Sequence, residues 1–374
     1  MEHKVIGLIN TFNTPSLSPL TDSRPLASTS FLGRYALIDF PLSCLCNSNI
    51  SQVGILVRDH QRSLLKHVGS MSTWVNNTKI AKNHIMFNEN ALVNGYLNTD
   101  INNLKENDWV FYSSDANYVV ILPIHILAPI DLRPFIREHV EKGAELSIIG
   151  TKIKDASKEY IGQHLLELDK DNVIKTGSIN NGKKKGEAIA SMSIYIINRK
   201  LLGDLVLKHS IDNPSLNLEE LIFAMGEANQ LKRNFLLYEN YSLCLSSFKD
   251  YMRISSSLLC YPEVSKLFNL NWPIYTVTHD TPPALYSKDA EVRSSYISNG
   301  ALIEGKVINS IIGRGVKVSK GAVVKNCIVF SNVTVGENAQ VSYALIDKYA
   351  IITRSHAVEG KADDPIYIKQ GAFV

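Results

Sequence analysis

The chain has 374 residues, of which 45% are hydrophobic and 20% charged, and its formal net charge is +3. This length and composition indicate a folded protein with two domains or one large one. The small net charge and the absence of a long Lys/Arg run argue against binding to nucleic acid or to a membrane surface. The densest basic run, Lys183-Lys184-Lys185, stands between turn-forming residues and is expected at a solvated loop tip.

The cysteines are odd in number and show no paired metal-ligand spacing, which is typical of reduced thiols in a cytosolic protein. They are Cys44, Cys46, Cys244, Cys260 and Cys327. The sequence also lacks a run of roughly 18 apolar residues, the length that a membrane span needs. We therefore expect a cytoplasmic protein.

In the first two thirds of the chain, strand-like apolar runs alternate with amphipathic stretches. The runs cover residues 5–9, 52–57, 118–122, 146–150 and 194–197, and a helix is predicted over 132–142. Nearly continuous apolar strands are buried on both faces, as in a mainly parallel sheet covered by helices. We predict a doubly wound α/β domain over residues 1–250, with its ligand at the carboxyl ends of the strands. Residues 251–285 are expected to form a connecting segment.

From about residue 286 the hydrophobic period changes to a 17-residue repeat. Three sets of aliphatic residues keep this spacing: Val307, Val324 and Val341; Ile312, Val329 and Ile346; Val318, Val335 and Ile352. A three-sided coil of short parallel strands, with one inward aliphatic residue on each side, gives such a repeat. An antiparallel β domain would not hold this register over three passes. We therefore predict a hexapeptide-type parallel β-helix of three to four coils over residues 286–374.

The loop after the first predicted strand is unusual for an α/β domain. Nucleotide-binding domains use glycines at this place, so that backbone N–H groups approach the phosphates. Here the loop begins at Asn10 and contains no glycine, but it does contain Phe12 and Pro15. Side chains therefore occupy the space that a triphosphate would need.

Short stretches along almost the whole chain resemble the glucose-1-phosphate adenylyltransferase (ADP-glucose pyrophosphorylase) family of glycogen and starch synthesis. They include Leu20-Thr21, Gly33-Arg34-Tyr35, Leu37-Ile38-Asp39-Phe40, Ala190-Ser191-Met192 and Asn271-Trp272-Pro273-Ile274-Tyr275. The resemblance lies in the order and spacing of these stretches and in the two architectures in this order. It implies a nucleotidyltransferase-like domain followed by a left-handed parallel β-helix.

The resemblance also implies a chemistry, in which the phosphate of glucose 1-phosphate attacks the α-phosphorus of ATP. Catalytic members carry a G-G-x-G-T-R-L loop, a basic residue in R-x-K-P, and two aspartates that hold Mg²⁺. In this chain Ser16 stands at the position of the loop arginine, Leu26 at that of the lysine, and His125 and Cys244 at those of the aspartates. The remaining positions of the altered loop are Thr11, Phe12, Asn13, Thr14, Pro15 and Leu17. The E-K-P motif that helps to hold the sugar has no counterpart near Lys175.

These departures predict that the chain has no catalytic residue, no nucleotide site at the loop, no Mg²⁺ site and no cofactor. His125 and Cys244 are ligands that Zn²⁺ accepts, but two ligands make a poor site, so packing or a local hydrogen bond is the preferred interpretation. Asp131 is expected to accept N–H groups at the start of the following helix.

A chain that keeps the frame but loses the catalytic groups is similar to the non-catalytic GlgD-type subunit that accompanies the catalytic one in some bacteria. The resemblance implies a regulatory subunit that modulates a catalytic ADP-glucose pyrophosphorylase partner in a heterotetramer, or a homo-oligomer when the chain is alone.

Three other functions stay open. A weakly active sugar nucleotidyltransferase would need substitutes for Mg²⁺, the lysine and the glycine loop. A hexapeptide acyltransferase would need a histidine base from the coils, where only His356 occurs. A sugar-phosphate sensor without turnover could use the stretch around His67, although the arginine that the family places after it is absent.

Overall fold

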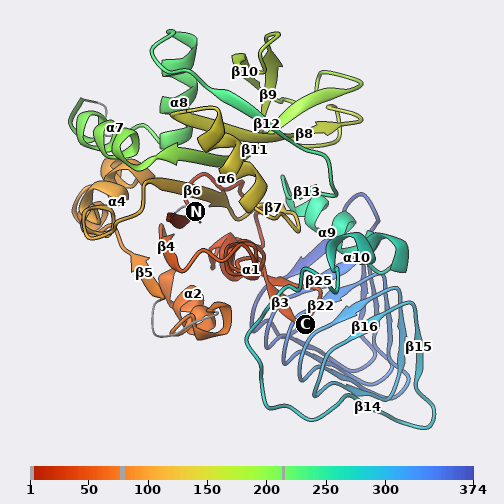
Figure 1. Cartoon of the computed structure of the whole chain (residues 1–374). Coiled ribbons are helices and arrows are strands. Elements are labelled where there is room, and N and C mark those ends of the chain that lie inside the picture. Colours follow the sequence, from red (N-terminus) through yellow and green to blue (C-terminus); the bar gives the residue numbers. More distant parts are fainter. Residues whose placement is uncertain (1–3, 76–80, 213–214) are drawn as a thin grey trace.

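The computed structural model describes residues 4–75, 81–212 and 215–374. Figure 1 shows an α/β domain beside a prism of stacked short strands, which forms the C-terminal part of the chain. The predicted fold class, a nucleotidyltransferase-like α/β domain followed by a left-handed parallel β-helix, is confirmed.

A nine-stranded sheet forms the centre of the first domain. Its main path has the order β10-β9-β11-β6-β1-β4-β5, and β8 joins β11 to β12. The bounds are β1 Val5–Asn10, β4 Gln52–Leu56, β5 Lys82–Met86, β6 Tyr118–Pro123, β8 Leu146–Ile153, β9 His164–Leu168, β10 Ile174–Ile179, β11 Ala188–Asn198 and β12 Asn234–Tyr238. Strands β6, β1, β4 and β5 are parallel to one another, so their carboxyl ends meet at one edge.

The other half of the sheet is largely antiparallel. Strand β11 runs antiparallel to β6, β8 and β9, and β9 and β10 form an antiparallel pair. The register of β11 with β8 shifts between Ser191 and Ile194. The alternation of strands and helices predicts the parallel core but not this reversal, which brings the middle of β11 beside the carboxyl end of β6.

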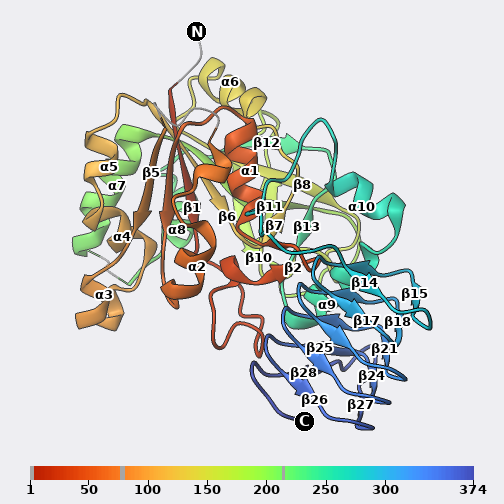
Figure 2. The same cartoon turned by 90° about the horizontal axis from the view of Figure 1, so that it is seen from below.

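Helices cover both faces of the sheet, because alternate strand residues point to opposite sides. On one face lie α1 (Asp39–Asn47), α6 (Arg133–Glu141) and α9 (Phe248–Ser257). On the other face lie α4 (Asp100–Glu106), α5 (Trp109–Tyr112), α7 (Arg199–Asp212) and α8 (Leu218–Glu227). In Figure 2, α4, α5 and α7 are on the side away from the β-helix. The shorter or more peripheral helices are α2 (Gln61–Val68), α3 (Asn90–Val93) and α10 (Tyr261–Leu267), with 3-10 turns η1 (Leu26–Ser28), η2 (Ser72–Trp74) and η3 (Gly95–Leu97).

Two small ribbons complete the first domain. Strands β2 (Ser30–Phe31) and β3 (Tyr35–Ala36) pair next to α1, and β7 (Ile126–Leu127) pairs with β13 (Leu243–Cys244). The second ribbon matters for the site, because it joins the segment after β6 to a segment more than a hundred residues later in the chain.

The β-helix has three parallel sheets of five strands each. The first holds β14 (Leu285–Tyr286), β17 (Leu302–Ile303), β20 (Lys317–Val318), β23 (Thr334–Val335) and β26 (Ile351–Ile352). The second holds β15 (Glu291–Arg293), β18 (Lys306–Ile308), β21 (Val323–Lys325), β24 (Gln340–Ser342) and β27 (Ala357–Glu359). The third holds β16 (Tyr296–Ile297), β19 (Ile311–Ile312), β22 (Ile328–Val329), β25 (Ala344–Ile346) and β28 (Ile366–Ile368).

The 17-residue repeat is confirmed in the central coils, where Val318 pairs with Val335 and Val335 with Ile352. The expectation of three to four coils was wrong, because each sheet has five strands. In the first sheet the step from β17 to β20 is shorter, with Ile303 opposite Val318, and in the third sheet the step from β25 to β28 is longer, with Ile346 opposite Ile368. Both steps break the spacing that defines the repeat in the sequence.

The third sheet of the β-helix faces the first domain. Its inward residues Ile312, Val329 and Ile346 fill the β-helix core, and their neighbours Ile311, Ile328 and Leu345 join the core of the first domain. Arg24 of the first domain and Asp347 of the β-helix form a buried ion pair across the same boundary. The two domains therefore share a continuous apolar contact with a charged pair inside it.

At the far end of the β-helix, residues 371–374 lie along the edge of β26. Ile351 donates its N–H to Ala372 O (2.8 Å), and Val374 donates to Ile351 O (2.9 Å). This segment therefore lies along the outer edge of β26, the last strand of its sheet.

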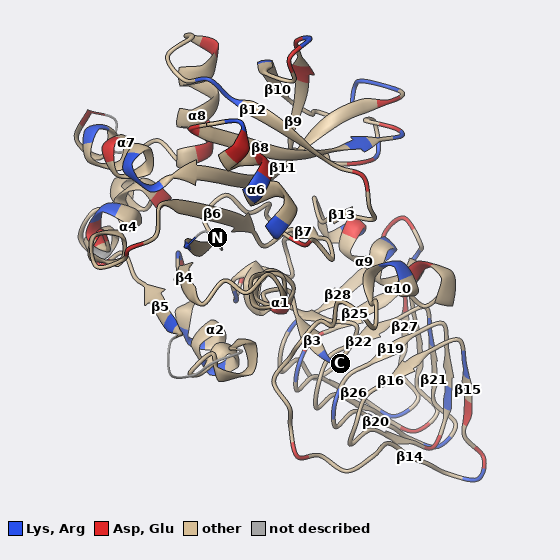
Figure 3. Cartoon of the chain, viewed as in Figure 1, with Lys and Arg blue, Asp and Glu red and all other residues tan. Residues whose placement is uncertain are grey.

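Within the described ranges, no helix has the length and apolar character required to cross a bilayer. The five cysteines, which all lie within the described residues, form no disulfide with one another, and all except Cys260 are buried. Figure 3 shows Lys and Arg interspersed with Asp and Glu over the outer elements, in keeping with the small net charge.

Candidate functional site

Hydrogen bonds and the burial of Phe12 hold the altered loop after β1 in place. Phe12 is only 3% exposed and belongs to the core cluster between the sheet and the helices α4, α5, α7 and α8. Its N–H donates to Asn10 Oδ1 (2.9 Å), while the Thr11 hydroxyl donates to Leu56 O (2.7 Å). Thr14 N–H donates to Phe12 O (2.9 Å), and Leu17 N–H donates to Thr21 Oγ1 (3.1 Å). Since Pro15 has no N–H, few loop amides remain for a phosphate.

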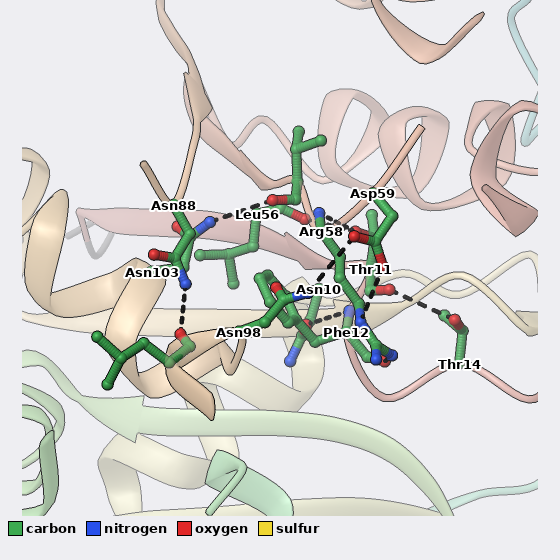
Figure 4. A network of polar contacts seen from close by, with 12 residues as sticks. Asn10, Thr11, Phe12, Thr14, Leu56, Arg58, Asp59, Asn88, Asn98 and Asn103 are labelled. Carbon is green, nitrogen blue, oxygen red and sulfur yellow. Dashed lines mark hydrogen bonds and ion pairs between the residues drawn. The ribbon is translucent and has the colours of Figure 1, made fainter. Parts of the chain in front are cut away.

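Arg58, which follows β4, binds the altered loop through its side chain (Figure 4). Its Nη1 donates to Phe12 O (3.3 Å), and its Nε lies 3.2 Å from Asp59 Oδ2. Asp59 in turn accepts a hydrogen bond from Asn98 Nδ2 (3.4 Å), which belongs to the segment between η3 and α4. Arg58 and Asp59 thus connect the altered loop to the segment between η3 and α4, and both side chains already have partners.

The carboxyl edge of β1 and β6 is filled by the beginning of α8. Ser193 Oγ and Tyr195 Oη donate to Glu219 Oε1 at 2.9 and 2.7 Å, and His164 Nδ1 lies 3.4 Å from the same oxygen. The cavity that remains has a volume of about 10 Å³, at the lower limit of what one water requires. It is lined by Asn10, Asn13, Ile121, Pro123, Ser193, Tyr195, Leu218 and Glu219.

Asp100, the first residue of α4, links the last residue of β1 to the first residue of α8. Asn10 Nδ2 donates to its Oδ2 (2.7 Å), and Leu218 N–H donates to its Oδ1 (2.8 Å). Burial raises the pKa of Asp100 to about 6, although these hydrogen bonds act in the opposite direction. A carboxylate that is fully enclosed therefore sits where the strand ends meet the helices.

The β7–β13 ribbon brings the segments of His125 and Cys244 together. Leu245 N–H donates to His125 O (2.9 Å), and Cys244 pairs with Ile126. Burial raises the pKa of the Cys244 thiol to about 12, and its Sγ lies 3.4 Å from Ser246 Oγ. His125 is 1% exposed, neither ring nitrogen has a hydrogen-bond partner among the described residues, and burial lowers its pKa. Both groups are therefore neutral at pH 7.

No group of three or more His, Cys, Asp or Glu side chains with the arrangement of a metal site occurs in the part of the chain that the structure describes. A thiol with a pKa of about 12 is also a poor ligand, since metals bind the thiolate. The residues present at these two positions do not fit a Mg²⁺ ion, which requires oxygen ligands.

Ser16 and Leu26 lie on a separate hollow of about 230 Å³ beside the altered loop. Ser16 is exposed and Leu26 is buried. The basic side chains that border this hollow, Arg24 and Arg58, already bind Asp347, Phe12 O and Asp59. Asp131 Oδ1 accepts the N–H of Arg133 (3.0 Å), which confirms its predicted place at the start of α6.

A larger cleft of about 440 Å³ lies between the first domain and the first coils of the β-helix. Arg34, His279 and Arg314 line it together with apolar residues such as Tyr35 and Phe268. Burial and the neighbouring Arg34 lower the pKa of Arg314, and burial, Arg314, His67 and Lys66 lower that of His279. Sequence reasoning missed Arg314 and His279, because isolated basic residues in turns carry no motif.

His67, the residue considered for effector binding, lies near this cleft, but its side chain already contacts Asp39. Its Nε2 lies 2.6 Å from Asp39 Oδ1, and its ring packs near Trp74 with centroids 6.0 Å apart.

Comparisons with known proteins agree with these two architectures. Residues 15–259 match the nucleotidyl transferase family, and residues 282–364 match the GlmU-like C-terminal hexapeptide family. A glucose-1-phosphate adenylyltransferase of Fervidobacterium nodosum is 27% identical over 97% of this chain and 89% of its own length. The glycogen biosynthesis protein GlgD of Bacillus subtilis is 27% identical over 99% of this chain and 96% of its own length, and GlgD of Geobacillus stearothermophilus is 27% identical over 87% and 84%.

Proposed function

This chain belongs to the nucleotidyl transferase family, and we propose that it acts in glycogen biosynthesis as a non-catalytic, regulatory subunit of an ADP-glucose pyrophosphorylase. The observation that carries the proposal is the filled carboxyl edge between β1 and β6. Phe12 is buried next to it and Glu219 occupies it, so that about 10 Å³ remains there, and the hollow of about 230 Å³ that stays open lies between the loops after β1 and β4.

The electrostatics of this edge also support a chain without turnover. Nucleotidyl transfer depends on cations that neutralise the charge spreading over the phosphates. His125 and Cys244 supply neutral groups at the two positions where the family resemblance implies aspartates, and Leu26 supplies an apolar side chain in place of a lysine. Of the two arginines that border the hollow beside the altered loop, Arg24 is committed to Asp347 and Arg58 to Phe12 O and Asp59.

A regulatory role requires a partner, and similarity to both adenylyltransferases and GlgD proteins supports a catalytic homologue as that partner. We propose that the two chains form a heterotetramer. The partner's activity changes only if binding favours one of two states of the catalytic subunit. A coupling of about 1 to 3 kcal/mol corresponds to a roughly 5- to 150-fold change in affinity for substrate or effector.

The first test is the activity of the purified chain. With ATP, glucose 1-phosphate and Mg²⁺, we expect no ADP-glucose synthesis above a buffer control. Turnover within about tenfold of a homologue with the intact glycine loop, a difference in barrier of only about 1.4 kcal/mol, would contradict the proposal.

The second test is co-expression with such a homologue, followed by light scattering and saturation kinetics. We expect a mixed tetramer with altered substrate or effector saturation. The matched control is the homologue expressed alone at the same concentration. Separate elution of the two chains, together with unchanged kinetics, would remove the regulatory role.

The cleft between the domains supports a second candidate, a sugar-phosphate sensor without turnover. Arg34, His279 and Arg314 present positive or ionisable groups to a space of about 440 Å³. Thermal shifts with glucose 1-phosphate and with inorganic phosphate would test it, with Arg314→Ala as the variant that should abolish the response. No shift with either compound would exclude this candidate.

A further inference from the structure

We propose that Glu219 is an internal ligand, whose carboxylate permanently occupies an oxyanion site formed by Ser193, Tyr195 and His164 at the carboxyl edge of the sheet. The ligand class that this site recognises is a carboxylate or phosphate oxygen. The inference concerns the chain by itself and stands whether or not a partner is regulated.

The first support is the convergence of donors from two strands on one atom. Tyr195 and Ser193 come from β11 and His164 from β9, and all three point at Glu219 Oε1 within 3.4 Å. Three hydrogen-bonding groups around a single oxygen are the arrangement of an oxyanion site. Structural carboxylates at helix starts instead bind backbone N–H groups, as Asp100 does here with Leu218.

The second support is the backbone at Ser193, which has a φ of 50°. The left-handed region is costly for a residue other than glycine, and such outliers cluster at ligand sites. The residue lies within the register shift of β11, and its hydroxyl contacts Gln163 Oε1 (2.8 Å) as well as Glu219. The irregular strand therefore aims a hydroxyl at the edge of the sheet, where a ligand of an α/β domain would bind.

The third support is that α8 fits the site with two side chains. Phe223, one turn after Glu219, stacks on the His164 ring with a centroid distance of 3.6 Å and an interplanar angle of 6°. Residues four apart share one face of a helix. One face of α8 therefore supplies both the ring that stacks on the His164 imidazole and the carboxylate that this imidazole contacts.

Charge and burial agree with an occupied site. The Glu219 side chain is 14% exposed. Burial would raise its pKa, but the hydrogen bonds from His164, Tyr195 and Ser193 outweigh burial, and the pKa lies below its ordinary value. The carboxylate is therefore charged at pH 7 and is held by these donors.

The main experiment is chemical rescue of Glu219→Ala. The variant leaves the Tyr195 hydroxyl without its acceptor and removes one of the two acceptors near Ser193, and we expect the Tm to fall by roughly 4 to 8 °C. Sodium acetate or formate at about 100 mM should restore part of this loss by binding only the folded state. Sodium chloride at equal ionic strength should not. A Tm of Glu219→Ala that acetate raises no more than chloride does would overturn the proposal.

Two controls make the rescue specific. Glu219→Gln fills the same space, so acetate should give it no gain beyond that of chloride. Glu220→Ala removes a neighbouring carboxylate that caps α8 through the Asn217 N–H (2.9 Å), so it should lower the Tm without any response to acetate. An equal acetate effect in all three variants would also reject the inference.

A second variant tests the inference if Glu219→Ala does not fold. Tyr195→Phe removes one donor, and its cost should be largest at neutral pH, where Glu219 is ionised. The cost should shrink as the pH falls through the folded-state pKa of Glu219, which lies below its ordinary value, because the carboxyl is then protonated. The other titratable groups facing Glu219 are His164, Asp100 and His125, and they are the same in both proteins.

The control for this second experiment is Tyr160→Phe. The Tyr160 hydroxyl is also buried but donates to Ser242 Oγ (2.6 Å). Its cost should be independent of pH. A cost of Tyr195→Phe that is equally constant from pH 3.5 to 8 would show that Tyr195 does not serve a charged Glu219.

Discussion

Arg24 and Asp347 form an ion pair inside the boundary between the two domains, although 323 residues separate them in the chain. Arg24 Nη2 also lies 3.2 Å from Gln370 Oε1, and Tyr367 donates to Asp347 Oδ2 (2.7 Å). The Asp347 side chain is 0% exposed and that of Arg24 5% exposed. Arg24, which borders the hollow beside the altered loop, thus has a structural partner in the β-helix.

Removal of Arg24 alone should destabilise the protein strongly. Arg24→Met leaves Asp347 buried without a cation, which typically costs about 3 to 5 kcal/mol of unfolding free energy. The double variant Arg24→Met with Asp347→Leu should recover most of the loss, since neither charge remains buried. Guanidinium unfolding measures both.

The exposed Lys306–Glu291 pair provides the control for this prediction (3.1 Å). Lys306→Ala should cost less than about 1 kcal/mol, because solvent screens such pairs. If Arg24→Met costs no more than Lys306→Ala, the ion pair does not hold the domains together.

Asp100 should make stability decrease as the pH rises. Its folded-state pKa of about 6 lies above the ordinary 3.8, so its contribution is fully present below pH 3.8 and is lost as the pH rises through 6. The shift corresponds to about 3 kcal/mol. In Asp100→Asn this decrease between pH 4 and 7 should vanish, as measured by urea unfolding at each pH.

Asp131 gives the control of opposite sign. Although burial would raise its pKa, the hydrogen bonds from Arg133 outweigh burial and lower it. Asp131→Asn should therefore reduce stability at neutral pH and have less effect in acid. Parallel pH curves for wild type and Asp100→Asn would contradict the role assigned to Asp100.

Restoring the two metal carboxylates alone should not restore activity. In His125→Asp with Cys244→Asp, Phe12 is still buried, Glu219 still fills the edge between β1 and β6, and Leu26 still stands at the position where the family resemblance implies a lysine. Groups that act as a unit do not contribute independently. Pyrophosphate release should stay at the level of the wild type, and an increase of about tenfold or more would show that the filled edge opens for ATP.

A substitution in one turn of the β-helix should increase the stability of the protein. The equivalent residues Asn309, Asn326 and Tyr343 all have left-handed backbones, with φ of 47°, 52° and 47°. Asn tolerates this region better than Tyr, so Tyr343→Asn should raise the unfolding free energy by about 0.5 to 1 kcal/mol. Tyr286→Asn, at an exposed residue of β14, is the control and should give no gain. A lower Tm for Tyr343→Asn than for wild type would contradict the argument.

The sequence predicts the parallel half of the sheet and the central coils, because each has a clear period. The buried runs around Ile6, Val53 and Val120 identify parallel strands, and Val318, Val335 and Ile352 keep the repeat of the β-helix. The reversal of β11 depends on pairing between distant segments, which the local pattern of hydrophobic residues does not encode.

The altered loop could be recognised from sequence, since Thr11, Phe12 and Thr14 stand where the family resemblance implies glycines and Pro15 follows them. The role of Glu219 could not, because a glutamate in the first turn of a helix is an ordinary feature. Only the three-dimensional convergence of Ser193, Tyr195 and His164 distinguishes it from the neighbouring Glu220.

The pairing of residues 371–374 with β26 has a practical consequence for handling the protein. Ile351 and Thr353 present the edge of a parallel sheet, and this segment already takes up their hydrogen bonds. A tag or truncation that pulls Ala372 and Val374 away would leave an open strand next to the exposed side chain of Phe373. Open apolar edges recruit other strands and lead to aggregation. Affinity tags and surface attachment points are therefore better placed on the first domain, at the exposed loop of Lys183 to Lys185.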